Sequence, residues 1–386
     1  MRILIVNRHY GDDHVPTGRM AADLVEALHG MGHEVEALSA RSSYATTAGA
    51  PSASNAAKIS CAWTPGEKHR LASWLFFLVQ AWFRVPFTRY DRCLLLTDPP
   101  FLAALTLFLS PFSRKLPKVY WWTMDLYPEI LASSGRMKTA SVAYKLLRRL
   151  NGAIMRRIGG FILLGDCQLQ RMRAYKTWRN EDYIVVPPWD KRPIARVDRA
   201  RNRFLKKYGL QQKKVALYAG NLGEGHVFAP LIEAARLLES AGRSDWALVF
   251  VVRGSKKQPL VDAAHGISSV VVLDYQPVDW TSDLLWAADV HLITMKEDMQ
   301  GLVVPSKLYG VLQTDAPVLF LGPEDADTAQ EIRRYRAGEA LGGQCSGADV
   351  VSALDRLHAA SISMQTERAM PDSNGPQRIA DFITAR

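Results

Sequence analysis

Short apolar runs alternate with amphipathic stretches through the first half of the chain. Residues 2–7 centre on an apolar run typical of a buried strand, and residues 19–31 place apolar positions at helical spacing before Gly32. A second strand pattern follows at residues 34–38. Further strands are predicted at residues 92–96, 119–122, 160–164 and 183–186. Strands separated by helices predict a parallel sheet with right-handed crossovers.

The same alternation returns after Pro187-Pro188-Trp189 and the basic stretch 191–203, which together resemble a linker. Strands are predicted at residues 214–218, 247–252, 270–273, 290–294 and 318–321, and helices at residues 229–241, 258–264, 281–287 and 306–313. We therefore expect two Rossmann-like doubly wound domains, at residues 1–190 and 191–370. Their ligands should lie in a cleft beyond the carboxyl ends of the strands. A last helix, 377–384 within the segment 371–386, is expected to pack back on the first domain.

Length and composition fit this two-domain organisation. A chain of 386 residues is too long for one small core. The opening apolar run is shorter than the about seven residues of a signal-peptide core. The apolar stretches 71–83 and 101–109 are shorter than the roughly 20 residues that span a bilayer. The cysteines stand far apart at Cys61, Cys93, Cys167 and Cys345, which fits a reducing compartment. We expect a cytoplasmic protein without a transmembrane helix.

The net charge of +10 is unevenly distributed, because residues 136–214 hold 21 basic and 5 acidic side chains. Apolar stretches flanked by cations, at residues 71–87 and 101–112, fit either a face lying on an anionic membrane or two helices packed in the first domain. Lipid head groups or a lipid pyrophosphate would suit the cations of the basic block, which include Lys145, Arg148, Arg149, Arg156 and Arg157. Nucleic acid is the competing partner, but no nucleic-acid module is recognised.

A glycine-rich segment, residues 220–226, follows the first strand of the second domain. Its glycines allow backbone N–H groups to approach a pyrophosphate or a sugar closely. The next strand ends in Arg253-Gly254-Ser255-Lys256-Lys257, where a dinucleotide-binding domain has an acidic residue. A phosphate contact is therefore favoured over the ribose contact of a dehydrogenase. The alternative is that the two lysines begin a solvated helix.

A second candidate segment, residues 300–310, runs from a loop into a helix. Ser306 is expected to cap that helix, and Lys307 lies in its first turn, where a cation opposes the helix dipole. A bound anion would remove this conflict. The alternative is a proline-started helix that binds nothing.

These segments, in this order and spacing, resemble the second domain of retaining GT-B glycosyltransferases of family 4. The matching stretches are 220–226, Tyr275-Gln276-Pro277, Ala287-Ala288-Asp289-Val290-His291, 304–310 and Pro317-Val318-Leu319. The first domain resembles the branch that makes bacterial surface polysaccharides. Its matching stretches are Gly32-His33-Glu34-Val35, Thr97 with Pro99-Pro100, Asp125-Leu126-Tyr127-Pro128-Glu129 and Leu146-Leu147-Arg148-Arg149-Leu150-Asn151.

The resemblance implies transfer of a hexosyl or N-acetylhexosaminyl group, with retention, from a nucleotide-sugar to a lipid-linked or polysaccharide-precursor acceptor. It implies a donor site in the second domain and an acceptor site in the first. The basic block and the apolar stretches, for their part, predict a peripheral position on the inner face of the membrane. Donor-binding residues would be Asn221, Gly223, His226, Arg253, Lys256, Gln300, Gly301, Leu302, Val303, Ser306 and Lys307. Fixed amides and lysines would stabilise the leaving diphosphate without a metal. No cofactor is expected, since the nucleotide-sugar is a substrate.

The chain departs from the family pattern at three positions. Many members carry carboxylates near the positions of Gln300 and Gly310, the first facing the sugar hydroxyls and the second the ribose. Gln300 can still donate and accept hydrogen bonds. Some members have a histidine where this chain has Met124, so a histidine-dependent mechanism does not transfer.

Acidic residues of the first domain are candidates for the acceptor side. Asp125 follows a predicted strand and is the leading carboxylate for orienting or deprotonating an acceptor hydroxyl, or else an N-cap. Glu129 is a weaker candidate, at the surface or at a helix start.

Gly18 and Arg19, in the first loop, should approach the acceptor or the donor phosphate, although Arg19 could be a solvated first-turn residue. Asp325-Ala326-Asp327 is interpreted as a helix start rather than a metal site.

Two alternative functions stay open at this point. A nucleotide-sugar 2-epimerase has the same two-domain fold and binds the same donor. A non-catalytic binding protein would fit the missing carboxylates at Gln300 and Gly310.

Overall fold

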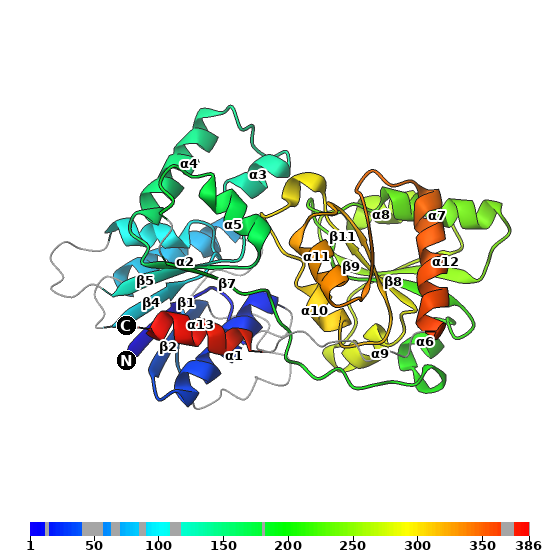
Figure 1. Ribbon diagram of the computed structural model, residues 1–386, viewed down its shortest axis with the longest axis horizontal. Coiled ribbons are helices and arrows are strands. Elements are labelled where there is room, and N and C mark those ends of the chain that lie inside the picture. The colour runs from blue at the N-terminus through cyan, green and yellow to red at the C-terminus, as the bar shows by residue number, and fades with distance from the viewer. Residues whose placement is uncertain are drawn as a thin grey trace. The chain divides into compact units, whose positions relative to one another are not determined.

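The computed structural model describes residues 1–11, 15–40, 57–62, 70–84, 90–108, 117–179, 182–363 and 374–385. The chain forms two compact units (Figure 1). Unit 1 comprises residues 1–188, 301–303 and 373–386, and unit 2 comprises residues 189–300 and 304–372. The division falls at Pro188, two residues before the limit expected from the sequence.

Unit 1 is built on a seven-stranded parallel sheet with the strand order β3-β2-β1-β4-β5-β6-β7. Its strands are β1 (Arg2–Val6), β2 (Glu34–Ala40), β3 (Ala57–Ala62), β4 (Arg92–Leu95), β5 (Lys118–Thr123), β6 (Gly160–Leu163) and β7 (Tyr183–Val185). Its helices are α1 (Pro16–Gly30), α2 (Arg70–Arg84), the 3₁₀ helix η4 (Leu102–Phe108), α3 (Glu129–Ser133), α4 (Val142–Met155), α5 (Asp166–Arg173) and α13 (Gly375–Thr384). The chain begins at β1 in the middle of the sheet and proceeds outward to β3. It then returns to β4, beside β1, and proceeds to the other edge at β7.

Unit 2 is built on a six-stranded parallel sheet with the strand order β10-β9-β8-β11-β12-β13. Its strands are β8 (Lys214–Asn221), β9 (Trp246–Arg253), β10 (Val270–Leu273), β11 (Val290–Thr294), β12 (Val318–Leu321) and β13 (Gly338–Leu341). Its α-helices are α6 (Arg203–Lys207), α7 (Ala229–Ser240), α8 (Lys257–Ala264), α9 (Thr281–Leu285), α10 (Lys307–Val311), α11 (Asp327–Arg334) and α12 (Gly347–Ser363). Its 3₁₀ helices are η5 (Arg199–Arg201), η6 (Val278–Trp280) and η7 (Glu297–Met299).

Both faces of the unit 2 sheet are buried, and β9 shows this residue by residue. Trp246, Leu248 and Phe250 belong to the core beneath α7 and α12. The alternate residues Val249 and Val251 belong to the core on the opposite face, with α6. Alternating side chains of one strand therefore fill two cores, which explains why the strand is apolar at successive positions instead of every second one.

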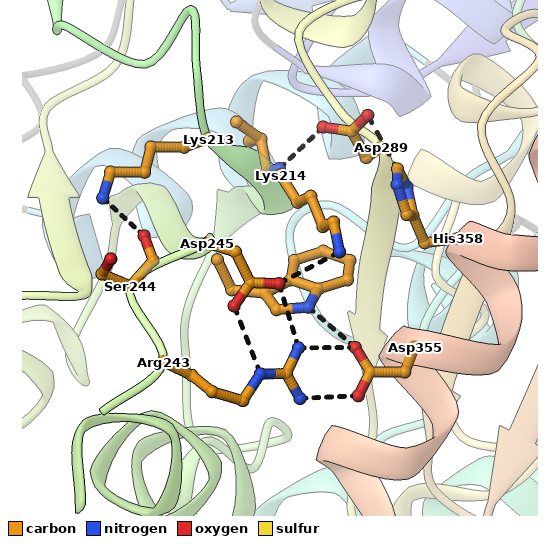
Figure 2. Close-up of polar contacts among 10 residues, drawn as sticks. Lys213, Lys214, Arg243, Ser244, Asp245, Asp289, Asp355 and His358 are labelled. Carbon is orange, nitrogen blue, oxygen red and sulfur yellow. Dashed lines mark hydrogen bonds and ion pairs between the residues drawn. The ribbon is translucent and has the colours of Figure 1, made fainter. Parts of the chain in front are cut away.

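An ionic cluster ties α12 to the amino ends of β8 and β9 (Figure 2). The Arg243 guanidinium donates to both oxygens of Asp355, at 2.7 and 2.8 Å, and to both oxygens of Asp245, at 3.2 and 3.0 Å. Lys214 Nζ donates to Asp245 at 3.0 Å, and the Trp246 indole N–H donates to Asp355 at 3.0 Å. Hydrogen bonds from Arg243 lower the pKa of Asp245 to about 2. Every charge in this cluster therefore has a partner of opposite sign.

The helix α13 packs against α1 within unit 1. Its apolar side is buried at Ile379, Ala380 and Ile383, and Phe382 lies edge-on to Tyr120 of β5 at 5.6 Å between ring centres. Arg92 donates to the Ile383 carbonyl at 3.1 Å. The fold class expected from the sequence, two doubly wound parallel sheets with a last helix returning to the first domain, is confirmed.

Element limits are where the sequence predictions differ most from the structure. The strands β10, β11 and β12 have the predicted limits, whereas α1 begins at Pro16, before the predicted start at residue 19. The predictions omitted β3, β13 and α12. None of the described helices is both long enough and apolar enough to cross a bilayer.

Candidate functional site

The glycine-rich segment lies at the topological switch point of unit 2. Here β8 and β11 are neighbours, and the chain leaves them toward opposite edges of the sheet, so the loops after the two strands diverge. β8 extends beyond its predicted end and includes Gly220 and Asn221, which pair with β9 up to Arg253. Gly254, at φ +117°, allows this pairing, because a Cβ there would lie 2.6 Å from Asn221 Oδ1. The missing Cβ of Gly254 therefore leaves room at this edge for the Asn221 side chain and the Leu222 carbonyl.

Lys307 places a buried cation beside the glycine-rich segment. Its Nζ atom is inaccessible to solvent and lies 3.6 Å from the centre of the Tyr218 ring. A Cβ on Gly220 would lie 3.4 Å from the same Nζ atom. Among the described residues, Nζ has no hydrogen-bond partner. Burial lowers the pKa of Lys307 to about 7. A buried ammonium without a counter-charge is costly, and a bound anion would supply that charge.

Ser306 does not cap the helix that follows it, so the predicted cap is wrong. Its backbone is helical, at φ −60° and ψ −21°, and its side chain makes no capping hydrogen bond. α10 contains five residues instead of the longer helix expected. The packing of Lys307 against Tyr218 and Gly220, rather than a long helix dipole, therefore defines its environment.

His226 lies beside Lys307 as a neutral ring. Its Nδ1 atom lies 2.7 Å from the Thr294 carbonyl oxygen, so Nδ1 carries the proton and donates it. The ring meets Tyr218 edge-on at 6.0 Å between centres. Burial, together with the charge of Lys307, lowers the pKa of His226 to about 3. With Nδ1 occupied, Nε2 is the atom of this ring that can accept a hydrogen bond from a ligand.

The other predicted cations of unit 2 have protein partners. Lys256, at the start of α8, forms an ion pair with Glu224 at 3.0 Å, and Ser255 donates to the same carboxylate at 3.1 Å. The Arg253 guanidinium lies 4.5 Å from the centre of the Tyr275 ring. Glu224, inside the glycine-rich segment, was not predicted from the sequence to have this role. Lys307 is therefore a stronger candidate than Lys256 for an anion contact.

The segment after η7 is divided between the two units. Gln300 belongs to unit 2, whereas Gly301, Leu302 and Val303 belong to unit 1. The Leu302 carbonyl accepts a hydrogen bond from Leu126 N at 3.2 Å. A Cβ at Gly301, φ +70°, would lie 2.4 Å from the Cys167 carbonyl oxygen. Leu302 thus packs beside the segment that carries Asp125, and Gly301 packs beside α5.

A carboxylate occupies the space beside Gly310. A Cβ at Gly310 would lie 3.5 Å from Asp190 Oδ2. Arg192 holds the Asp190 carboxylate with bonds of 3.0 and 2.7 Å, and Gln313 donates to the Asp190 carbonyl at 3.1 Å. No role for Asp190 could be predicted from the sequence, because its approach to α10 depends on the tertiary fold.

Asp125 lines a small pocket in unit 1 at the carboxyl ends of β4 and β5. Its backbone N–H donates to Thr97 Oγ1 at 3.1 Å. The pocket is lined by Leu96, Thr97, Phe101, Leu102, Ala103, Trp121, Asp125, Tyr127 and Asn151. A carboxylate and an amide in a largely apolar pocket can orient a hydroxyl group.

Glu129 begins α3, which is one of the two positions the sequence allowed, but its carboxylate is largely buried. Tyr175 donates to its Oε1 atom at 2.6 Å, and Arg148 lies 3.3 Å from the same oxygen. Burial raises the pKa of Glu129. Asn151 donates to the Tyr175 hydroxyl at 3.2 Å, which connects Glu129 to the pocket of Asp125.

The first loop contributes differently from the prediction. Gly18 and Arg19 lie inside α1, and a Cβ on Gly18 would lie 3.3 Å from the backbone of His9. The loop side chains that gather at the switch point of unit 1 were missed: Arg8 and His9 contact Asp98 at 3.2 and 2.9 Å. Burial opposes ionisation of Asp98, but the bonds from His9 and Arg8 lower its pKa overall.

Asp327 is the first residue of α11, which fits its interpretation as a helix-start residue. Within the described ranges, no group of three or more His, Cys, Asp or Glu side chains has the arrangement of a metal site.

The known proteins that resemble this chain share its two-domain fold, and several of them are named as glycosyltransferases. No protein-family model matches the chain. The chain is 28% identical over 291 residues to WbjE of Pseudomonas aeruginosa, named as a probable glycosyltransferase, covering 73% of this chain and 70% of WbjE. It superposes on WaaG, a glycosyltransferase involved in lipopolysaccharide biosynthesis, with a TM-score of 0.67 and 17% identity over the full length of both chains. HepE of Anabaena, solved in complex with UDP-glucose, gives a TM-score of 0.64 and 13% identity, covering 99% of this chain and 95% of HepE. The architecture is that of the GT-B glycosyltransferases.

Proposed function

We propose that this chain, a GT-B protein similar to bacterial glycosyltransferases, transfers a sugar from a nucleotide-sugar to an acceptor in surface-polysaccharide synthesis. The observation that carries the proposal is Lys307, whose buried Nζ atom has no partner among the described residues and lies beside Gly220. A nucleoside diphosphate supplies the missing negative charge. HepE, which has a similar fold, was solved with UDP-glucose, which supports a donor of this class.

The donor side acts through electrostatic stabilisation of the leaving group. Breaking the bond between the sugar and the diphosphate develops negative charge on the diphosphate oxygens. Lys307 and the backbone N–H groups after β8 would stabilise that charge in a desolvated setting, where fixed donors act most strongly. Neutral His226 adds Nε2 as an acceptor for a sugar hydroxyl. We propose that Asn221 and Gly223 complete this side, and that Gln300 contacts the sugar.

The acceptor side is proposed to lie in unit 1. Asp125 would orient the attacking hydroxyl or accept its proton, with Thr97 and Asn151 in the same pocket as further polar groups. Leu302 and Val303 would contribute from the segment beside Leu126.

We also propose a hexosyl or N-acetylhexosaminyl donor, retention of the anomeric configuration, a lipid-linked acceptor and catalysis without a metal. The family resemblance supports the first three. The fourth is supported by Lys307, since an ammonium together with backbone N–H groups can offset part of the negative charge of a diphosphate. NMR of the product's anomeric centre tests retention, and assays with added chelator or Mg²⁺ test the fourth.

A panel of nucleotide-sugars with lipid-pyrophosphate and saccharide acceptors tests the reaction. Release of nucleoside diphosphate that requires an acceptor is expected for one donor, and Lys307→Met should abolish most of it. Lys206→Met changes an exposed lysine of α6 and should leave the rate unchanged. An altered nucleotide-sugar formed without acceptor would identify an epimerase. Binding of a nucleotide without any turnover would identify a non-catalytic protein.

A further inference from the structure

Phe101 has a backbone conformation that phenylalanine rarely adopts. Its φ is +62°, in the left-handed region, and among the described residues other than glycine only Arg336, at φ +49°, shares a positive φ. A Cβ crowds its own backbone in this conformation, which glycine adopts without cost. Such outliers cluster at functional sites, where the surrounding structure holds them. A bulky aromatic residue therefore occupies a turn that would favour glycine.

The turn places the Phe101 side chain at the mouth of the pocket that contains Asp125, here called the Asp125 pocket. Six of the residues that line this pocket are buried: Leu96, Thr97, Leu102, Ala103, Trp121 and Asn151. The other three, Phe101, Asp125 and Tyr127, are partly exposed, so they form its mouth. The pocket has room for about one water-sized group. Two aromatic rings and a carboxylate thus surround an opening that admits little more than a hydroxyl group.

A buried hydrogen-bond network holds the second ring of this mouth. Asn151 Nδ2 donates to the Tyr127 carbonyl. It also donates to the Tyr175 hydroxyl at 3.2 Å, and that hydroxyl donates to Glu129 at 2.6 Å. The Phe101 and Tyr127 rings lie 6.3 Å apart between centres, with 55° between their planes. The turn therefore positions one ring, and the network positions the backbone that carries the other.

The Asp125 pocket does not have the chemistry of a phosphate site. Its lining residues, all of them described by the structure, include the carboxylate of Asp125 and no Lys, Arg or His. A phosphate in this pocket would face a like charge without a compensating cation. A hydroxyl group, in contrast, can donate a hydrogen bond to the carboxylate. A sugar ring offers such hydroxyl groups at its edge, and the C–H bonds on its face are attracted to the negative face of an aromatic ring.

We propose that Phe101 determines which acceptor unit 1 binds: its ring, together with that of Tyr127, contacts the C–H face of a sugar whose hydroxyl enters the Asp125 pocket. This inference rests on the proposed function, because it names the group that the acceptor presents to Asp125. That group is a sugar hydroxyl and not a phosphate of a lipid carrier. An earlier transfer reaction must therefore have attached a sugar to the carrier or chain before this protein acts.

Saturation-transfer NMR with simple glycosides and the full-length protein tests the proposal. The probes are the methyl glycosides of glucose, galactose, N-acetylglucosamine and rhamnose. At least one should bind without a nucleotide, with the strongest transfer to the C–H protons of one ring face. Farnesyl phosphate, which offers a phosphate and no sugar, should not displace it. Failure of every glycoside to bind, or displacement by farnesyl phosphate, overturns the proposal.

Substitutions at Phe101 separate the ring from the backbone conformation. Phe101→Ala and Phe101→Gly both remove the ring and should each weaken glycoside binding about tenfold, whereas Phe101→Tyr keeps the ring and should bind within about twofold of the unchanged protein. Phe101→Gly should nevertheless melt at a higher temperature than Phe101→Ala, because glycine adopts this φ without strain.

The matched control is Arg336, an exposed residue between α11 and β13 in unit 2. Arg336→Gly should likewise melt at a higher temperature than Arg336→Ala. Both variants should bind the glycoside as the unchanged protein does, since relief of strain alone does not alter the Asp125 pocket. Nucleotide binding, measured by thermal shift with UDP and GDP, shows that the donor site of each variant is intact.

Weaker glycoside binding by both Phe101→Ala and Phe101→Gly, with unchanged nucleotide binding, supports the proposal. If Phe101→Gly binds the glycoside as well as the unchanged protein, the ring has no contact with the sugar and the proposal fails. Glycoside binding that depends on Phe101 stands even when no donor is turned over, a result that would refute the proposed function alone. Turnover with an unchanged acceptor KM in Phe101→Ala would refute this inference alone.

Discussion

Two buried or half-buried cations of unit 2, at opposite ends of the same sheet, have opposite surroundings. At the amino ends of the strands, Arg243 is bonded to two carboxylates (Figure 2). At the carboxyl ends, Lys307 Nζ is buried against Tyr218, without a hydrogen-bond partner among the described residues. The pKa of Arg243 is raised by its bonds to Asp355 and Asp245, whereas burial lowers that of Lys307 to about 7. We propose that the paired Arg243 stabilises the fold and that the unpaired Lys307 binds the negative charge of a ligand.

Replacing Lys307 should produce the largest effect of this comparison. Lys307→Met is expected to lower kcat by about 10²–10³-fold, because a cation at the leaving group is lost. It should also raise the free energy of unfolding of the nucleotide-free protein by about 1 kcal/mol or more, since an unpaired buried charge is removed. Steady-state kinetics and denaturant unfolding measure the two effects. A variant that is less stable and equally active would contradict the assignment.

Breaking the ionic cluster around Arg243 should destabilise the fold and leave nucleotide binding unchanged. Asp355→Ala removes the partner of Arg243 and of the Trp246 indole, and should lower the free energy of unfolding by about 2 kcal/mol, a value reduced by the partial exposure of the cluster. Nucleotide affinity should not change. Asp274→Ala, which removes an exposed ion pair with Lys257, is the matched control and should cost about 0.5 kcal/mol or less. Loss of nucleotide binding in Asp355→Ala would mean that the two ends of the sheet are coupled.

Titration of His226 tests the burial of groups at the carboxyl ends of the strands. Its pKa is about 3 in the fold and near 6.5 in an unfolded chain, so the unfolded state takes up the proton first as pH falls. The resulting stability is complete above about pH 6.5 and is lost as pH falls toward about 3. His226→Asn should reduce this acid loss by about 1 kcal/mol or more, measured by urea unfolding across that range. Parallel pH curves for the two proteins would show that His226 is protonated in the fold.

The smallest predicted effect is the uptake of a fraction of a proton when a nucleotide binds. Since the pKa of Lys307 is about 7, much of the ligand-free protein has a neutral amine slightly above that pH. A diphosphate should raise that pKa again, so nucleotide binding should take up protons there. Calorimetry of UDP binding in buffers of different ionisation enthalpy measures the uptake, and Lys307→Met should remove it. Equal enthalpies in all buffers would place the phosphate elsewhere.

The sequence predicted the parts of this molecule that depend on local pattern. Buried strands such as β11 and β12 were predicted from apolar runs between turn residues, and their predicted limits were correct. β13 was missed because its residues are half-buried and include Glu339. The helix α12 could have been found: Ser346 and Asp349 form a capping box before the apolar positions of the helix, each side chain bonding the other residue's backbone N–H.

The position of the candidate residues in the fold was predictable from the sequence, whereas the contacts of their side chains were only partly predictable. Glycines after β8 and a lysine after β11 pointed to the switch point. That Lys307 is buried, and that Lys256 is paired with Glu224, depends on contacts between segments far apart in sequence. The same holds for Asp190 beside Gly310 and for Asp98 beside Arg8. A single sequence gives the identity of such residues, whereas the fold decides which of them lack a partner.

The return of α13 to unit 1 has a consequence for biosynthesis. Residues of unit 2 are all translated before α13, yet the apolar surface of α1 that α13 covers belongs to the first part of the chain. During synthesis, the nascent unit 1 must therefore hold α1 and the edge around Arg92 uncovered while the ribosome completes unit 2. Chaperones that bind exposed apolar segments can act in that interval, because unit 1 is complete only after α13 has been translated.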